Sequence, residues 1–230
     1  MMRAKYSPNP VVVAPHSMAL GGGAEVSMHS SVTMANAELY MGLVEVGVGL
    51  IPGAGGCKEM VVRFTGNMPE GVAYDPNPFI QKAFEYIGMA KVSTSAEEAR
   101  SWGMLRRNDV VVMNQDSRLM AAKRLALGLA AGGYVPPPRQ TVKAAGRGCQ
   151  AAISAYLMQM RSGGFATPHD VTVGNRLASV LTGGDVPTGT RLSEQELLDL
   201  EREAFLSLCG EQKTMDRIQH MLMKGKPLRN

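Results

Sequence analysis

The chain has 230 residues, enough for one large domain or one and a half, and its hydrophobic content of 45% is sufficient for a true core. The formal net charge is only +4, and the basic residues are scattered, whereas nucleic-acid binding favours a dense basic patch interleaved with aromatic residues. The sequence shows no signal-peptide core, no apolar run of membrane-spanning length and no zinc or disulfide spacing among its three cysteines. We therefore expect a cytoplasmic protein without a metal, a nucleic-acid partner or a membrane partner.

The first predicted elements are a strand and a helix joined by glycines. Residues 11–14 are typical of a buried strand, within an apolar run that extends to residue 20, and a helix can begin near residue 22. Backbone N–H groups at the start of a helix have no intrahelical partner, and the helix dipole adds partial positive charge there. This turn therefore predicts a place that stabilises an oxygen atom gaining negative charge, beside Gly21, Gly22 and Gly23.

Two glutamates follow the glycine turn. Glu25 lies about one turn into the predicted helix, on the face of the free N–H groups. Glu45 lies in an apolar, glycine-rich segment, where a lone carboxylate is costly to bury unless it is paired or used. Near an oxyanion hole, two carboxylates can add or remove water beside a carbonyl, because one can deprotonate the water while the other exchanges a proton with the neighbouring carbon. For Glu25 alone, an ordinary first-turn glutamate is the competing interpretation.

The glycines after Glu45 favour no nucleotide-binding motif. Gly47 and Gly49 are followed by Pro52 instead of the third glycine of a dinucleotide fingerprint, and no Gly-Lys-Ser/Thr sequence completes a P-loop. The chain also lacks the Gly-x-Ser-x-Gly elbow of serine hydrolases. The turn at residues 51–56 is instead predicted to lead into a helix.

The remaining elements are predicted to be mostly helical. Short strands are expected at residues 32–35 and 109–113, and the three prolines at residues 136–138 form a stiff connector. An exposed loop is expected at residues 67–78. Helices are predicted at residues 79–89, 95–102, 117–131, 144–161, 167–181, 193–208 and 212–223. The apolar stripes of the last helices could contact another subunit or a further domain.

Two motifs resemble a known family. Residues 19–25 (Ala-Leu-Gly-Gly-Gly-Ala-Glu), together with Glu45 ahead of residues 51–56 (Ile-Pro-Gly-Ala-Gly-Gly), resemble the signature of the enoyl-CoA hydratase (crotonase) family. The chain is more narrowly similar to the hydratase end of bacterial proteins that join a 3-hydroxyacyl-CoA dehydrogenase to an enoyl-CoA hydratase, through residues 37–52, 198–205 and 225–230.

The resemblance implies an α/β fold. We expect a crotonase-like (ClpP/crotonase) core, truncated at its amino end, with a helical carboxyl-terminal extension. The core would be a partial one over residues 1–135, carrying the oxyanion-hole and glutamate motifs, and residues 136–230 would form the helical region. The 17 methionines could line an acyl-chain pocket, although ordinary core filling is the blander interpretation.

The resemblance also implies roles for single residues. Gly22 matches the family's second oxyanion-hole N–H donor, and Glu25 and Glu45 match its two catalytic glutamates. The family's first donor lies in an upstream Ala-Gly-Ala-Asp-like loop, which residues 1–20 do not contain. Further contacts with the substrate are expected at Gly21, Gly23 and Gly53.

The implied reaction adds water to a 2-enoyl-CoA and gives a 3-hydroxyacyl-CoA, as in fatty-acid β-oxidation. No cofactor is expected for this step, because the substrate carries its own coenzyme A, and NAD would belong to the absent dehydrogenase part. The implied partners are the acyl-CoA substrate and either further copies of the chain or a dehydrogenase domain. Two alternatives stay open: an enoyl-CoA isomerase of the same fold, and a non-catalytic fragment that serves only as a packing or interaction module.

Overall fold

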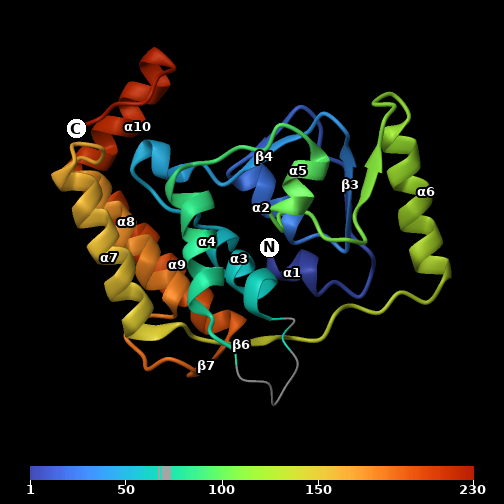
Figure 1. Ribbon diagram of the computed structural model, residues 1–230. Coiled ribbons are helices and arrows are strands. Elements are labelled where there is room, and N and C mark those ends of the chain that lie inside the picture. Colours follow the sequence, from blue (N-terminus) through green and yellow to red (C-terminus); the bar gives the residue numbers. More distant parts are fainter. Residues whose placement is uncertain (67, 69–73) are drawn as a thin grey trace. The chain divides into compact units, whose positions relative to one another are not determined.

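The computed structural model describes residues 1–66, 68 and 74–230 (Figure 1). These residues form two compact units. Unit 1 comprises Met1–Leu43 and Val92–Arg139, and unit 2 comprises Val44–Lys91 and Gln140–Asn230. Half of the predicted loop at residues 67–78, namely residues 67 and 69–73, lies outside the described residues, and its last two residues belong to a helix that begins at Asn77.

One boundary between the units falls directly after Arg139, close to the predicted proline connector. Residues 44–91, by contrast, form a unit with the carboxyl-terminal helices. The division of the chain into residues 1–135 and 136–230 stays a prediction, and the two units are described separately below.

Unit 1 is built on short parallel strands. A three-stranded sheet has the order β1-β3-β5, and a second pair joins β2 to β4, both in parallel. Strand β3 is buried along its whole length, as expected for a strand with a partner on either side. The elements are α1 (Met2–Lys5), β1 (Val12–Val13), β2 (Met18–Leu20), α2 (Gly22–Met28), β3 (Val32–Asn36), β4 (Tyr40–Gly42), α5 (Ala96–Ser101), β5 (Val110–Val112) and α6 (Arg118–Ala131).

The predicted strands of unit 1 are confirmed in position, but the first is shorter than expected. The apolar run before the glycines forms two strands, β1 and β2, instead of one. Ser17 lies between them with φ of +52°, a left-handed conformation that interrupts an extended chain. Strand β2 therefore leads directly into the glycine turn and helix α2.

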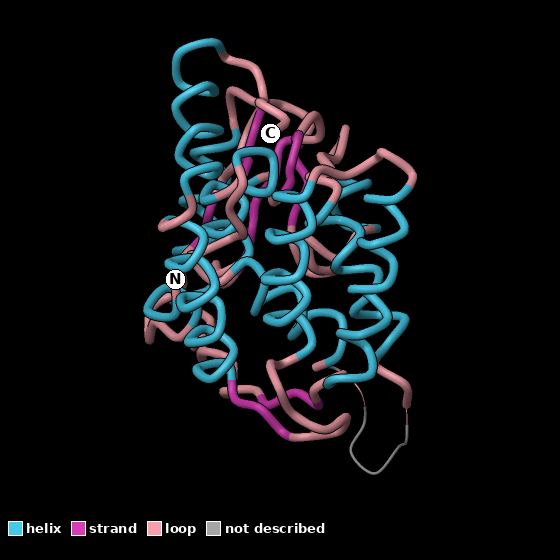
Figure 2. The backbone as a smooth tube through the Cα atoms, turned by 90° about the vertical axis from the view of Figure 1, so that its left-hand side faces the viewer, coloured by secondary structure: helices cyan, strands magenta, loops and turns pink. Residues whose placement is uncertain are grey.

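Unit 2 is mostly helical, and Figure 2 shows how short the strands of the chain are beside its helices. Its elements are η1 (Glu45–Val48), α3 (Gly56–Thr65), α4 (Asn77–Gly88), β6 (Thr141–Lys143), α7 (Gly146–Ser162), α8 (Pro168–Thr182), β7 (Arg191–Ser193), α9 (Glu194–Cys209) and α10 (Gln212–Lys224). The predicted helices are confirmed. Strands β6 and β7 were not predicted: they pair in antiparallel fashion, with Val142 opposite Leu192.

Local capping explains why the helix starts of unit 2 are predictable. At the start of α9, the Ser193 hydroxyl accepts a hydrogen bond from the Glu196 N–H at 3.3 Å, and the Glu196 carboxylate accepts one from the Ser193 N–H at 2.8 Å. Thr167 and Asp170 form the same capping box at the start of α8. Each box satisfies two donors that the helix itself leaves unpaired.

A carboxylate from α9 fills the amino end of α3. Gly55, with φ of +102°, ends the glycine turn, and α3 begins directly after it. The Glu201 carboxylate accepts hydrogen bonds from the Gly55 N–H at 2.5 Å and the Lys58 N–H at 3.0 Å. The Lys58 ammonium group forms ion pairs with Glu59 at 2.7 Å and with Glu194 at 3.0 Å. The buried charged groups are therefore paired, and their contacts fix α9 against the glycine turn at the start of α3.

Gly53 in this turn lies against an aromatic side chain. A β-carbon placed on Gly53 would come within 2.6 Å of the Phe205 ring of α9, closer than real atoms approach. Glycine is therefore required here for packing. The expectation that Gly53 also contacts the substrate stays a prediction.

Helix η1 is held by α8 and α10. The Thr214 hydroxyl donates to the Gly49 carbonyl at 2.9 Å and lies 2.9 Å from the His169 Nε2 atom. Because the hydroxyl proton points at Gly49, His169 must donate through Nε2. Arg217 donates to the Asp170 carboxylate at 2.7 Å. Gly49 itself has φ of +80°, and a side chain there would meet Thr214, Arg217 and His169.

We expect Glu201→Ala to lower the free energy of unfolding by about 3 kcal/mol or more, because it leaves buried N–H groups without an acceptor. Urea denaturation would measure the change. Glu203→Ala, at an exposed position of the same helix, is the matched control and should change stability by less than about 0.5 kcal/mol. Equal stability of the two variants would contradict the structural role of Glu201.

We also expect a pH dependence of stability that originates at His169. Burial, and then the Arg217 charge, lower the pKa of His169 below its ordinary value. The unfolded chain therefore binds the proton more tightly, so stability is full above about pH 6.5 and falls as the pH drops from there toward the folded-state pKa. Denaturation of the His169→Gln variant across this range should show a weaker dependence. His16→Gln, at an exposed position, should leave the dependence unchanged.

Candidate functional site

The glycine turn of unit 1 leaves the first residues of helix α2 exposed. Gly21, with φ of +53°, precedes α2 and donates its N–H to the Gly42 carbonyl at 2.8 Å. Gly22 and Gly23 are exposed, and a side chain placed on Gly22 would meet no atom within 4 Å. The first N–H groups of a helix have no intrahelical acceptor. The turn thus keeps the geometry that the sequence predicts for Gly22, whose role as an oxyanion donor stays a prediction.

Glu25 lies on the first turn of the same helix. Its exposed fraction is only 2%, although a buried carboxylate is costly unless its oxygens are compensated. The backbone carbonyl of Glu25 lies 2.7 Å from Nδ1 of His29, which closes α2. Four of the predicted site residues therefore belong to one short segment of unit 1: Gly21, Gly22, Gly23 and Glu25.

Glu45 opens helix η1 in unit 2 and is half-buried. Its backbone carbonyl accepts a hydrogen bond from the Leu50 N–H at 3.1 Å, and the network of His169, Thr214 and Arg217 holds the end of the same helix at Gly49. Gly53 also belongs to unit 2. The second candidate carboxylate therefore lies on a backbone that packing from distant helices holds in place.

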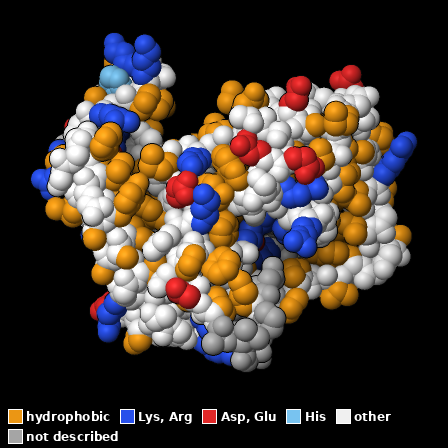
Figure 3. Space-filling model, viewed as in Figure 1, with side chains coloured by type: hydrophobic (Ala, Val, Ile, Leu, Met, Phe, Trp, Pro, Cys, Tyr) orange, Lys and Arg blue, Asp and Glu red, His pale blue; other side chains and the backbone are white. Residues whose placement is uncertain are grey.

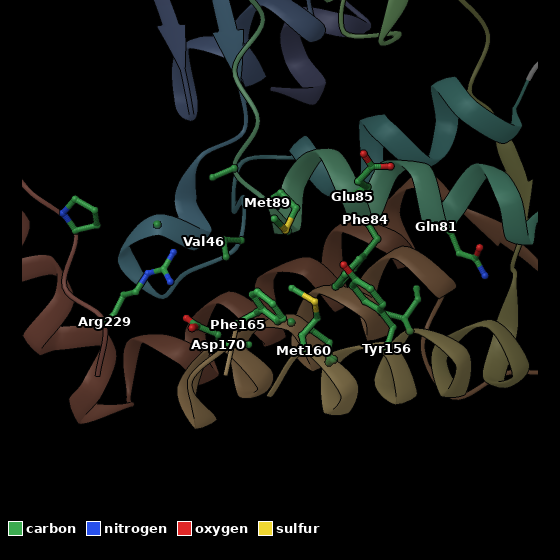
Figure 4. A pocket seen from close by; sticks show the side chains of 18 of the residues that line it. Val46, Gln81, Phe84, Glu85, Met89, Tyr156, Met160, Phe165, Asp170 and Arg229 are labelled. Atoms are coloured by element: carbon green, nitrogen blue, oxygen red, sulfur yellow. The ribbon is translucent and has the colours of Figure 1, made fainter. Parts of the chain in front are cut away.

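A pocket of about 630 Å³ lies within unit 2. Val46 and Gly47, the two residues after Glu45, form part of its wall. Figure 4 shows the pocket between α4 and α7, with Phe84, Tyr156, Met160 and Phe165 turned toward it. In Figure 3, hydrophobic side chains lie exposed over the same helices. Sequence patterns did not single out these residues, although the methionine content was compatible with an apolar pocket.

Other reactive groups give no competing site in the described part of the chain. Burial, and then the charge of Asp75, raise the pKa of Cys149 to about 11, so its thiol is protonated at neutral pH. Within the described residues, no three His, Cys, Asp or Glu side chains gather as metal ligands. Among those residues, no helix is both long and apolar enough to cross a bilayer.

Comparison with known proteins places the chain within longer relatives. It is 48% identical over 230 residues to a Bacillus subtilis (strain 168) protein named "Probable 3-hydroxyacyl-CoA dehydrogenase", and it spans 28% of that protein's length. It is 30% identical over 125 residues to the "Probable enoyl-CoA hydratase" of the same organism, a match that covers 54% of the chain and 43% of that protein. The chain thus spans less than half of either relative. No protein-family model matches it.

The fold comparison agrees with these relatives. The structure of an enoyl-CoA hydratase from Mycobacterium avium subsp. paratuberculosis K-10 aligns with a TM-score of 0.55 over 99% of this chain and 68% of that protein. At 14% identity this likeness shows the fold alone. It confirms the α/β crotonase-like architecture with a helical carboxyl-terminal region that the glycine and glutamate motifs imply. The chain is therefore a crotonase-fold homologue of the enoyl-CoA hydratases.

Proposed function

We propose that this chain is the enoyl-CoA hydratase part of a fatty-acid β-oxidation protein. The observation that carries the proposal is the presence of Glu25 and Glu45 at both glutamate positions of the crotonase motifs, in a chain with the crotonase fold. The buried position of Glu25 and the constrained backbone at Glu45 support it, because a catalytic carboxylate must be held in a defined geometry.

The proposed reaction adds water across the C2–C3 double bond of a 2-enoyl-CoA. One of the two glutamates takes a proton from a water molecule as the water oxygen bonds to C3, and the two glutamates share the acid and base roles. The electrons of the double bond move toward the thioester, and the resulting enolate oxygen is stabilised by the N–H of Gly22. A proton delivered to C2 then gives the 3-hydroxyacyl-CoA. The substrate carries its own coenzyme, so the step needs no metal and no NAD.

The wider setting is part of the same proposal. A relative named as a 3-hydroxyacyl-CoA dehydrogenase contains a stretch that corresponds to this whole chain. The product of the hydration is the substrate of such a dehydrogenase, so we propose an association with a dehydrogenase domain, with NAD bound there. A homo-oligomer is an alternative arrangement. The chain has three cysteines, an odd number that lie far apart in the sequence, and this pattern supports a reducing, cytoplasmic compartment.

We expect Glu25→Gln and Glu45→Gln each to lower the rate of crotonyl-CoA hydration by on the order of 10²–10⁴-fold, because glutamine keeps the shape of the side chain but cannot exchange a proton. Loss of the ultraviolet absorbance of the conjugated thioester measures the rate. Circular dichroism should show unchanged folding. Glu38→Gln is the control: Glu38 lies between Glu25 and Glu45 in the sequence and is exposed, so this variant should keep full activity.

Two results would count against this assignment. A glutamine variant that keeps most of its rate would remove that glutamate from the mechanism. Conversion of a 3-enoyl-CoA to its 2-enoyl isomer, without hydration, would show an isomerase of the same fold, and a folded wild-type chain with neither activity would favour a non-catalytic module.

A further inference from the structure

The backbone of Glu45 forms a single tight turn that ends at Gly49. Helix η1 is a 3-10 helix of only four residues. The Gly49 N–H donates to the Val46 carbonyl at 3.0 Å, and the Leu50 N–H donates to the Glu45 carbonyl at 3.1 Å. Because so short a turn has few hydrogen bonds of its own, its position depends on the contacts that other segments make with it. A contact at Gly49 therefore bears directly on the orientation of Glu45.

A buried hydroxyl group of α10 makes that contact. Thr214 is 0% exposed, and its hydroxyl donates to the Gly49 carbonyl at 2.9 Å, although the two residues lie 165 positions apart in the sequence. The same oxygen lies 2.9 Å from Nε2 of His169, which is also buried. A hydroxyl group has only one proton, so the Thr214 oxygen accepts a hydrogen bond from His169 while it donates to Gly49. These two partners together fix the direction of the hydroxyl proton.

Arg217 holds α10 against the start of α8, the helix that carries His169. Its guanidinium group donates to the Asp170 carboxylate at 2.7 Å and to the Thr167 hydroxyl at 3.1 Å. The Asn230 side chain accepts a third hydrogen bond from Arg217 at 2.8 Å. A buried guanidinium group that has several partners is costly to move, because each bond would have to be broken without access to water. Helices α8 and α10 therefore form one support for the contact with Gly49.

The absence of a side chain at Gly49 allows this close contact. Gly49 has a φ of +80°, and a β-carbon there would lie 3.0 Å from the Thr214 hydroxyl oxygen and 3.2 Å from Nε2 of His169. A residue with a side chain would push both groups away from the turn and would be strained at this φ. The turn and its two polar neighbours are therefore matched to each other in shape as well as in hydrogen bonding.

We propose that Thr214 and His169 are positioning residues that fix the orientation of Glu45 for proton exchange. The inference rests on the proposed hydratase function. Thr214 acts through the Gly49 carbonyl, and His169 acts by orienting the Thr214 hydroxyl, so neither needs to touch the substrate. A carboxylate that exchanges a proton must lie within hydrogen-bond reach of the reacting atoms, and a displacement of about 1 Å can lower a rate by about 100-fold.

Thr214 and Thr182 provide a matched pair of buried threonines. Thr182 is also 0% exposed, and its hydroxyl donates to a backbone carbonyl, that of Ala178, at 2.8 Å. Thr182 is the last residue of α8 and His169 is the second, so about 20 Å of helix separates them. Valine has nearly the shape of threonine but no hydroxyl group. Thr214→Val and Thr182→Val thus remove the same kind of hydrogen bond, but only the first removes a contact with η1.

The experiment measures kcat and KM for the hydration of crotonyl-CoA. For Thr214→Val, we expect kcat to fall by on the order of tenfold to 100-fold while KM changes by less than about twofold, because the contact affects proton exchange and not binding. Thr214→Ser, which keeps the hydroxyl group, should restore most of kcat, and Thr182→Val should leave both constants unchanged. An equal loss of kcat in the two valine variants would overturn the inference, and so would an unchanged kcat in Thr214→Val.

A further variant keeps the test decisive if Thr214→Val does not fold. Thr214→Cys places a thiol group where the hydroxyl group lies, and a thiol is a weaker hydrogen-bond donor. Its kcat should therefore lie below that of Thr214→Ser, with KM again nearly unchanged. A kcat equal to that of Thr214→Ser would show that the strength of the bond to Gly49 does not matter for the reaction, and the inference would fail.

Hydrogen exchange separates this inference from the hydratase function. The amide protons of Gly49 and Leu50 are bonded within the turn, so their exchange rates report its opening without any substrate. Faster exchange at both protons in Thr214→Val, but not in Thr182→Val, supports the inference even if the wild type hydrates no thioester, in which case only the hydratase function fails. Unchanged exchange in Thr214→Val overturns the inference even if the wild type hydrates crotonyl-CoA.

Discussion

The N–H groups that begin a helix need an acceptor, and two glycine turns of this chain meet that need in different ways. At α3, the acceptor is internal: the carboxylate of Glu201 binds the N–H groups of Gly55 and Lys58. At α2, Gly22 and Gly23 are exposed and no atom occupies the space in front of Gly22. One turn therefore serves to attach α9, whereas the other leaves its first helical residues exposed, as the proposed oxyanion site requires.

The charged groups also differ in their surroundings. Lys58 and Arg63 pair with Glu59 and Glu194 within unit 2, so these charges are compensated by one another and contribute to the structure of the unit. The glutamates of the crotonase motifs have a different setting. Glu25 is buried on the helix that begins with the exposed glycines, and Glu45 is half-buried at the start of η1.

Much of the local structure could be predicted because its causes are local. Capping boxes at Thr167 and Ser193 mark the starts of α8 and α9, and the apolar periodicity of these helices is confirmed by their burial. Strands β6 and β7 escaped prediction because each has only three residues, and each is stabilised by pairing with a partner far along the chain. The split of the first apolar run into β1 and β2 depends on the backbone of Ser17, which no side-chain pattern reveals.

The sequence by itself determined the strand, glycine turn and helix around Gly22, the presence of Glu25 and Glu45, and the family that these motifs resemble. All of these are carried by residues close together in the chain. Only the tertiary structure decided that Glu201 fills the turn after Gly53, that Phe205 packs against Gly53, and that α4 and α7 enclose a pocket. The physical reason is that burial, ion pairing and cavity shape depend on side chains from distant segments, and their meeting is set by packing and not by local periodicity.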